Sequence, residues 1–314
     1  MKSYREIFAD KPLRLVTRQS KLALAQTDIV TAELGSIAHE VIGVSTSGDE
    51  ILDRPLVEIG GKGVFIKALE AVMVNGDADA AVHSFKDMET ILADGTRLCC
   101  VLARADRRDA LVGPYKSIEA LPHGAVIGTS SVRRASILRN LRPDLEIKLL
   151  RGNVQRRLAR LDAGDYDAII LAMAGLARLG LAERGHPLSE KVMMPPASQG
   201  VIAIQIATGN DERRIAMEQV FAAMHCQATS LATRAERAML AHLDGSCRTP
   251  IGAIADLCDD NILSLTGMVL STDGCDRFEA SASCELSDGN APEELGVKVA
   301  DALLSQCGGR DFLA

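Results

Sequence analysis

Short apolar runs alternate with amphipathic segments along the first hundred residues. The pattern predicts strands at 13–17, 41–45 and 78–82, with helices over 20–34 and 64–74 between them. Alternating strands and helices are typical of a parallel or mixed sheet with helices on both faces. This part of the chain is therefore predicted to form an α/β lobe.

The same alternation returns after residue 125. Strands are predicted at 125–127, 146–150, 168–172 and 201–206. Helices are predicted at 132–140, 154–163 and 174–179. We interpret this part of the chain as a second lobe of the same type.

The last ninety residues have a different order of elements. A helix at about 228–243 precedes a loop, and three strand-like runs follow near 250–256, 262–269 and 277–284. A final helix is predicted near 292–305. This order indicates a small α+β domain with an antiparallel sheet.

Length and composition indicate a folded protein of several domains. The chain has 314 residues, of which 47% are hydrophobic, enough apolar surface for more than one core. No run of eighteen apolar residues is present, which argues against a membrane span, and the first residues lack the apolar stretch of a secretion signal. We therefore expect a cytoplasmic protein.

The eight cysteines do not form a recognisable metal-binding pattern. No CxxC pair occurs, and the six histidines add no zinc-type spacing, so no metal is predicted. Most of these thiols are expected to be small buried groups in a reducing compartment.

Charge is distributed unevenly along the chain. The formal net charge of −7 disfavours nonspecific nucleic-acid binding. Residues 97–184, however, hold 14 Arg and 2 Lys against 9 acidic residues, a surplus of positive charge. Arginine can pair with carboxylate or phosphate through two parallel hydrogen bonds. The segment could form an anion-binding cleft, or it could supply solvated helix faces and salt bridges.

Polar residues and arginines gather where predicted strands end and helices begin. Three such places are 17–20 (TRQS), 129–134 (TSSVRR) and 151–153 (RGN). Helix N-termini present free N–H groups and a partial positive charge, which attract anions. A Ser or Thr in this position can also be only a helix cap. Three arginine-bearing sites together favour a ligand with several carboxylates or phosphates.

Two further motifs have both a functional and an ordinary interpretation. HSFKD at 83–87 places Asp87 after a strand, where a carboxylate could assist proton transfer or stabilise a cation, or could pair with Lys86 at the surface. His83, Ser84 and Asp87 lack the context of a hydrolase triad. GGKG at 60–63 has neither Walker A nor GxGxxG spacing and can be a flexible turn.

Cys247 differs from the other cysteines because it lies in a Gly/Ser loop, DGSCRTP, beside Arg248. A neighbouring cation and loop exposure lower the pKa of a thiol and increase its reactivity. Cys247 could therefore be a nucleophile or an attachment point, or an incidental loop cysteine.

Taken together, the motifs resemble the porphobilinogen deaminase family, whose enzymes are also called hydroxymethylbilane synthases. The resemblance covers essentially the whole chain. Its segments are LRLVTRQSKLALAQ (13–26), GGKGVFIKALE (60–70), AVHSFKD (81–87), IGTSSVRRASIL (127–138), LRGNVQRRLARLDAGDYDAIILAMAGLARLG (150–180) and TRAERAMLAHLDGSCRTPIG (233–252).

The resemblance implies a fold of three domains. Two are lobes like those of periplasmic binding proteins, with mixed sheets, and the chain returns late to the first lobe. The third is a C-terminal α+β domain with a three-stranded antiparallel sheet. The implied boundaries are 1–103 with 200–223 for domain 1, 104–199 for domain 2 and 224–314 for domain 3.

The resemblance also implies an activity and its residues. Family members join four porphobilinogen molecules head to tail on a dipyrromethane cofactor, releasing ammonia and hydroxymethylbilane. Cys247 corresponds to the cysteine that holds this cofactor by a thioether. Asp87 corresponds to the catalytic aspartate, which assists proton transfer and stabilises the cationic azafulvene and pyrrolenine. The positions that match cofactor and substrate contacts are Arg18, Ser20, Lys86, Thr129, Ser131, Arg133, Arg134, Arg151, Arg157 and Gly200.

Several positions depart from the family pattern. Glu58 replaces a frequent lysine, Met88-Glu89-Thr90 lacks a usual proline, and Ser198 and Ser246 replace glycines. None removes Asp87 or Cys247, so an active enzyme is expected.

The implied partners are porphobilinogen and the growing oligopyrrole, without nucleic acid or membrane, and the implied state is a monomer. The alternative function is a two-lobed solute-binding protein for an organic anion. Such a protein would carry a secretion signal and would need neither Cys247 nor a third domain.

Overall fold

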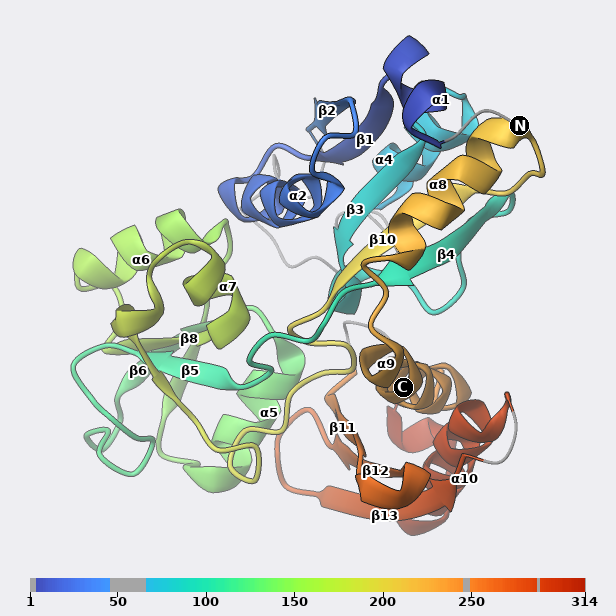
Figure 1. The fold of residues 1–314 in the computed structure, drawn as a ribbon. Coiled ribbons are helices and arrows are strands. Elements are labelled where there is room, and N and C mark those ends of the chain that lie inside the picture. The colour runs from blue at the N-terminus through green and yellow to red at the C-terminus, as the bar shows by residue number, and fades with distance from the viewer. Residues whose placement is uncertain (1–3, 46–65, 245–248, 287–288, 314) are drawn as a thin grey trace. The chain divides into compact units, whose positions relative to one another are not determined.

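The computed structural model describes residues 4–45, 66–244, 249–286 and 289–313. The chain forms two compact units, each assembled from separate segments (Figure 1). One unit comprises residues 1–104 and 201–229, and the other comprises 105–200 and 230–314. The chain therefore crosses between the units three times.

The first unit contains a mixed five-stranded sheet with the order β2-β1-β3-β10-β4. β1, β2 and β3 run parallel, whereas β10 is antiparallel to both of its neighbours. The strands are β1 (Leu13–Arg18), β2 (His39–Val44), β3 (Ala80–Ser84), β4 (Thr96–Val101) and β10 (Ile202–Ala207).

Helices cover both faces of this sheet because successive strand side chains point to opposite sides. Phe8, Val30 and Phe221 pack with Leu15 on one face. They belong to α1 (Tyr4–Asp10), α2 (Lys21–Leu34) and α8 (Glu212–Ala222). Val16 points to the opposite face, where it packs with α4 (Lys67–Val74). A short 3₁₀ helix, η2 (Phe85–Asp87), follows β3.

The second unit contains another mixed five-stranded sheet, with the order β7-β6-β8-β5-β9. β6, β7 and β8 are parallel, and β5 is antiparallel to β8 and β9. The strands are β5 (Asp109–Val112), β6 (Val126–Thr129), β7 (Glu146–Leu149), β8 (Ala168–Ala172) and β9 (Gly185–Pro187).

Helices again lie on both faces of the sheet in the second unit. Ile137 and Leu138 of α5 (Val132–Leu141) pack on one face, and Leu158 and Leu176 pack on the other. Leu158 belongs to α6 (Val154–Asp162) and Leu176 to α7 (Met173–Arg178), which precedes η3 (Ala182–Arg184).

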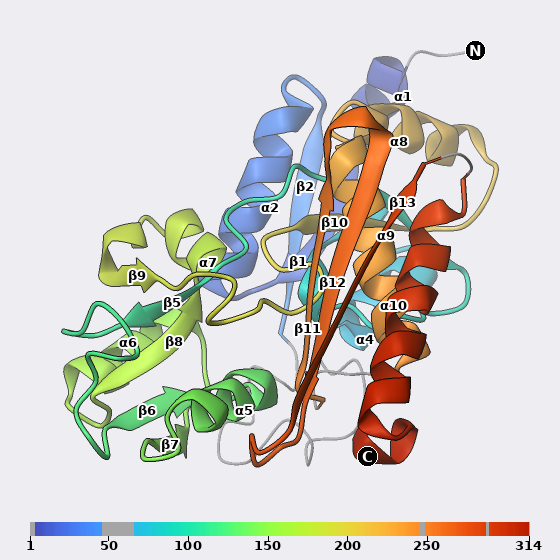
Figure 2. The ribbon, with the colours of Figure 1, turned by 90° about the horizontal axis from the view of Figure 1, so that it is seen from below.

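The second unit also contains a three-stranded antiparallel sheet with the order β11-β12-β13. Figure 2 shows α10 lying along this sheet. The core between them includes Met239 from α9 and Val299 from α10. The elements are α9 (Gln227–His242), β11 (Ile251–Leu257), η4 (Asp259–Asn261), β12 (Ile262–Leu270), β13 (Arg277–Glu285), α10 (Ala291–Cys307) and η5 (Arg310–Leu313).

Polar and apolar contacts join the two sheets of the second unit. Met194 and Met268 share one buried core with the residues of α5. Arg107 donates hydrogen bonds to Glu190 Oε1 at 2.7 Å and to Asp256 Oδ1 at 2.8 Å, linking the segment before β5 to β11. These contacts explain why the two sheets belong to one compact unit.

The predicted fold class is confirmed: two mixed α/β sheets are accompanied by a three-stranded antiparallel sheet. The division into three domains stays a prediction. No helix within the described ranges is long and apolar enough to cross a membrane.

Several elements were absent from the sequence prediction, namely α1, β4, β5, α8 and β9. β5 and β9 have four and three residues, too few for a periodic pattern. The GGKG loop, Glu58 and the first residues of the helix predicted at 64–74 lie outside the described residues, and α4 begins at Lys67.

Candidate active site

In the first unit, predicted site residues follow two neighbouring parallel strands. β1 pairs directly with β3, so the carboxyl ends of both strands lie at the same edge of the sheet. Arg18 is the last residue of β1, and Ser20 precedes α2. Lys86 and Asp87 lie in η2, directly after β3. The fold therefore groups these four residues at the edge where open α/β sheets bind ligands.

Ser20 is the N-cap of α2, as predicted. Its backbone is extended, and its Oγ accepts a hydrogen bond from the backbone N–H of Ala23 at 3.3 Å. This bond satisfies one of the free N–H groups of the first turn. The remaining N–H groups of the turn are available to an anion.

Asp87 is partly exposed and lies in η2. Its carboxylate has no hydrogen bond or ion pair with any residue in the described part of the chain. The Asp87 carboxylate therefore does not form the alternative surface ion pair with Lys86. A carboxylate in this state is available for a ligand N–H or a developing cation.

His83 is buried on β3, four residues before Asp87. The pKa of His83 is lowered to about 4: burial is the main cause, a hydrogen bond with Gln205 opposes the shift, and the positive charge of Arg18 adds to it. His83 Nε2 is buried and has no hydrogen-bond partner among the described residues. Ser84 Oγ is bonded to Gln26 instead, at 2.8–2.9 Å, so the residues around His83 do not form a Ser–His–Asp triad.

In the second unit, capping residues open the two helices that follow β6 and β7. Thr129 Oγ1 accepts a hydrogen bond from Ser131 N–H at 3.1 Å. Ser131 is the N-cap of α5, and Asn153 is the N-cap of α6. The predicted helix starts are thus confirmed, and both lie at the carboxyl edge of the parallel strands.

Arg133 and Arg134 lie in the first turn of α5 and share one buried carboxylate, that of Asp109. Arg133 Nη2 donates to Asp109 Oδ2 at 2.7 Å, and Arg134 Nη2 donates to Asp109 Oδ1 at 2.7 Å. Asp109 is fully buried, and the two arginines are only 4% and 6% exposed. The expected anion-binding pair is therefore already part of a buried ion cluster.

The electrostatics of this cluster keep Asp109 ionised. Burial alone would raise the pKa of Asp109, but the charges and hydrogen bonds of Arg134 and Arg133 outweigh burial and hold the pKa well below its usual range. Gln199 Nε2 also donates to Asp109 Oδ1, at 2.9 Å. Neither Asp109 nor Gln199 was predicted as a site residue from the sequence, where the acidic start of the apolar run DALV was the available signal for Asp109.

The remaining predicted residues of this unit occupy loops and helix starts. Arg151 is buried in the bend after β7, and Arg157 Nε donates to the carbonyl of Gly152 at 2.8 Å. Gly200 has a φ of +86°, and its carbonyl accepts from Arg178 Nη2 at 2.6 Å. Gly200 thus serves a backbone turn just before β10.

Much of the arginine surplus in residues 97–184 is used in ion pairs with nearby carboxylates. The paired arginines are Arg97, Arg107, Arg108, Arg133, Arg134, Arg142, Arg160 and Arg184. The salt-bridge interpretation therefore accounts for about half of the segment's arginines. Cys247 and Ser246 lie outside the described residues.

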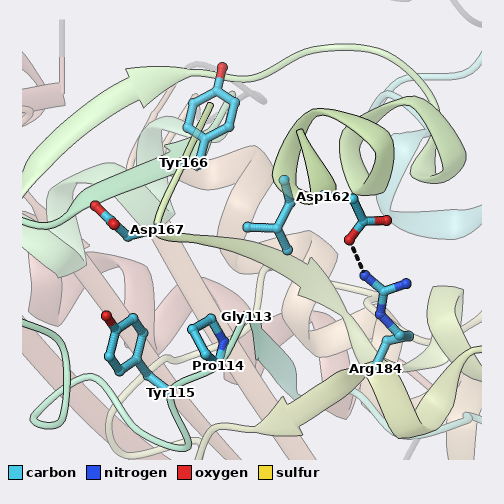
Figure 3. Close-up of a pocket in the computed structure, with 8 residues that line it drawn as sticks. Gly113, Pro114, Tyr115, Asp162, Tyr166, Asp167 and Arg184 are labelled. Atoms are coloured by element: carbon cyan, nitrogen blue, oxygen red, sulfur yellow. Dashed lines mark hydrogen bonds and ion pairs between the residues drawn. The ribbon is translucent and has the colours of Figure 1, made fainter. Parts of the chain in front are cut away.

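A pocket of about 450 Å³ opens elsewhere in the second unit (Figure 3). Gly113 follows β5 and Asp167 precedes β8, so the pocket lies at the edge opposite the carboxyl ends of β6 and β8. Its cation, Arg184, is paired with Asp162 at 2.6 Å. The pocket therefore includes none of the predicted site residues.

Comparison with known proteins identifies the family. Residues 13–215 match the family described as "Porphobilinogen deaminase, dipyromethane cofactor binding domain". Residues 230–305 match "Porphobilinogen deaminase, C-terminal domain". The chain belongs to the porphobilinogen deaminase family. A relative named porphobilinogen deaminase, from Burkholderia pseudomallei (strain 668), is 44% identical over 300 residues, covering 94% of this chain and 90% of its own length.

Solved structures share a more distant likeness. The periplasmic VFT2 domain of BvgS from Bordetella pertussis is 13% identical, with a TM-score of 0.41 over 70% of this chain and 92% of its own. The amino acid ABC transporter substrate-binding protein AbpA from Streptococcus pneumoniae is also 13% identical, with a TM-score of 0.36 over 69% of this chain and 91% of its own. The description of the fold rests instead on the strand orders given above.

Proposed function

We propose that this protein is a hydroxymethylbilane synthase, a transferase of tetrapyrrole biosynthesis. It joins four porphobilinogen molecules head to tail on a dipyrromethane primer and releases ammonia and hydroxymethylbilane. Family membership carries this proposal, because the likeness spans both family domains and 94% of the chain.

The described residues fit a dipyrromethane group. Each pyrrole of such a group bears an acetate and a propionate, so its binding site needs cations and N–H donors. Each unit carries capped helix N-termini of its own: that of Ser20 lies in the first unit, and those of Ser131 and Asn153 lie in the second. The cluster of Arg133 and Arg134 holds two cations against one anion, and Arg133 Nε is buried without a hydrogen-bond partner among the described residues. This donor set has capacity for a further carboxylate.

The residues that would hold the group are those that match the family's attachment and binding positions. Cys247 would attach it by a thioether, and the bound group would supply the pyrrole carbon from which the chain grows. The positions proposed to bind its carboxylates and those of the substrate are Arg18, Ser20, Lys86, Thr129, Ser131, Arg133, Arg134, Arg151, Arg157 and the turn at Gly200.

Asp87 is proposed as the catalytic carboxylate. It would accept hydrogen bonds from pyrrole N–H groups, assist proton transfer as ammonia leaves, and stabilise the positive charge that develops on the substrate. Its support is the absence of any competing partner among the described residues. An acid that was already paired would have to break that pair before acting.

We also propose the three-domain division, a cytoplasmic location and a monomeric state. The presence of three separate sheets supports the three-domain division. The seven cysteines that the structure describes are all free, as expected in a reducing compartment. Light scattering during gel filtration would test the monomer, for which the chain mass is 33.4 kDa.

The decisive experiment measures the intact mass of the purified protein and its reaction with porphobilinogen. We expect a covalent mass excess of two pyrrole units, ammonia release and formation of hydroxymethylbilane. A solute-binding protein would bind an organic anion reversibly and would show the mass of the bare chain. That second result, together with no ammonia release, would overturn the proposal.

A further inference from the structure

The cluster around Asp109 has a role beyond that of a simple ion pair. Asp109 is the first residue of β5 and pairs with Ala172, the last residue of β8. The carboxylate therefore lies at the same edge of the sheet as the start of α5. This edge carries Thr129 and Ser131, which we propose as ligand contacts.

Asp109 holds both guanidinium groups by several hydrogen bonds. Arg134 contacts both oxygens, through Nε to Oδ2 at 3.2 Å and through Nη2 to Oδ1 at 2.7 Å. Its Nη1 donates to the carbonyl of Ile170 at 2.9 Å. Each of the three nitrogens of Arg134 thus donates one of these hydrogen bonds, and a bidentate pair of this kind is geometrically rigid.

Arg133 is held at two of its three nitrogens. Nη2 donates to Asp109 Oδ2 and Nη1 donates to the carbonyl of Met194, whereas Nε is buried and has no partner in the described part of the chain. The cluster contains two cations and one anion. It therefore keeps a positive charge and donor capacity for one more acceptor.

We infer that Asp109 is a positioning residue of the dipyrromethane site, holding Arg133 and Arg134 in the orientation in which their remaining donors meet a ligand carboxylate. This inference rests on the proposed function. In this role Asp109 acts through the arginines and does not itself need to bind the ligand. Gln199 supports the arrangement by donating to Asp109 Oδ1.

Asp109→Asn tests the inference because a change in charge and a loss of positioning would change the loading rate in opposite directions. Removing the anion makes the site more positive, so an effect of charge alone would speed the loading of an anionic ligand. Loss of the held geometry should instead slow loading, by about tenfold or more. The measurement is the rate at which protein without the two-pyrrole mass acquires it from porphobilinogen, followed by intact mass.

Asp144→Asn is the matched control. Asp144 pairs with Arg142 in the same unit, and this pair includes neither Asp109 nor its two arginines. The control makes the same change in net charge and is expected to load at the wild-type rate. Loading of Asp109→Asn at or above the wild-type rate would overturn the inference.

A second pair of variants covers the case in which Asp109→Asn does not fold. Asp109→Asn/Arg134→Met restores the native surplus of one positive charge and is compared with Arg134→Met alone. If Asp109 positions Arg133, the double variant loads at least about tenfold more slowly than Arg134→Met. Equal rates, or loss of fold in every Asp109 variant, would leave Asp109 a structural residue and overturn the inference.

The wild-type protein separates this inference from the proposed function. If the wild type carries no two-pyrrole mass and acquires none, the proposed function fails. If the wild type loads normally and the Asp109 variants do too, only the positioning role fails.

Discussion

Two aspartates near strand ends, Asp109 and Asp87, have different surroundings and therefore different proposed roles. Asp109 is fully buried and accepts hydrogen bonds from Arg133, Arg134 and Gln199. Asp87 is partly exposed and lacks a partner among the described residues. A carboxylate whose acceptor sites are filled is held in place, whereas one without partners can respond to a substrate.

Asp87→Asn should therefore abolish most turnover and leave the fold intact. The change preserves size but removes the negative charge that would stabilise the developing cation. Loss of one such preorganised group typically lowers the rate by about 10²–10³. Single-turnover release of ammonia from porphobilinogen measures the effect. Asp94→Asn, the loss of an exposed carboxylate in the same unit, is the control. A rate within about threefold of wild type would move the chemistry away from Asp87.

Cys247→Ser should lose the covalent pyrrole group. A hydroxyl is a much weaker nucleophile at neutral pH than a partly ionised thiol, so the thioether cannot be replaced efficiently. The intact mass should equal that of the bare chain, and the denatured protein should not colour with Ehrlich's reagent, which reacts with free pyrrole positions. Cys258→Ser, at an exposed free cysteine, should keep the wild-type mass excess. A normal coloured adduct in Cys247→Ser would exclude this attachment point.

At the scale of elements, the segment before β10 is held under local strain. Ser198 has a φ of +63°, a region that favours glycine, and its Oγ is buried without a hydrogen-bond partner among the residues that the structure describes. Its backbone N–H donates to Glu236 Oε2 at 2.7 Å, and Glu236 Oε1 accepts from Ala255 N–H at 3.0 Å. Glu236 therefore ties this segment to α9 and β11, and the family's frequent glycine would fit the backbone better.

Ser198→Gly is expected to stabilise the protein. Relief of the left-handed conformation and removal of the buried hydroxyl each contribute about 1 kcal/mol or more, partly offset by the greater entropy of glycine in the unfolded chain. A net gain of roughly 1 kcal/mol should raise the Tm measured by calorimetry. Ser198→Ala separates the two effects, because it removes the hydroxyl but keeps a Cβ at positive φ. A lower Tm for Ser198→Gly would contradict the strain argument.

At the scale of the whole molecule, the two units contain buried ionisable groups that respond to different ranges of pH. His83 lies in the first unit, and Asp109 lies in the second. Burial lowers the pKa of His83 to about 4, with Arg18 adding to the shift and Gln205 opposing it. Arg134 and Arg133 overcome the effect of burial and lower the pKa of Asp109.

The first unit should consequently lose stability earlier on acidification. The folded state keeps His83 neutral, whereas His83 in the unfolded chain binds a proton near pH 6.5. The contribution of His83 to the free energy of unfolding therefore declines as pH falls from about 6.5 to 4. The size of this effect is on the order of 3 kcal/mol. Asp109 has a depressed folded pKa, so its contribution declines only below its unfolded pKa of about 3.9.

Calorimetry between pH 7 and 3, with hydrogen exchange to assign the regions that open, would measure this difference. His83→Gln should flatten the pH dependence of the first unit between pH 6.5 and 4, and leave that of the second unit unchanged. The assignment to His83 would be contradicted if both units of the wild type lost stability over the same pH range. It would also be contradicted if His83→Gln left the pH dependence of the first unit's stability unchanged.

The sequence by itself determined those features that depend on neighbouring residues. Hydrophobic periodicity located most strands and helices within a few residues, because core-facing positions repeat every two or about 3.6 residues. The capping role of Ser20 was equally local, since its hydroxyl bonds an N–H three residues away. Contiguous motifs were also sufficient to identify the family, and with it Asp87 and Cys247 as candidates.

Only the tertiary structure decided which distant residues meet. β10 lies between β3 and β4 although it is about a hundred residues away in the chain, and no local pattern encodes that order. Asp109 pairs with arginines 24 and 25 residues further on because the register of β5 against β8 brings it to the start of α5. Sequence patterns distinguish a charge from an apolar side chain, but the partner that neutralises a buried charge depends on how the strands and helices pack.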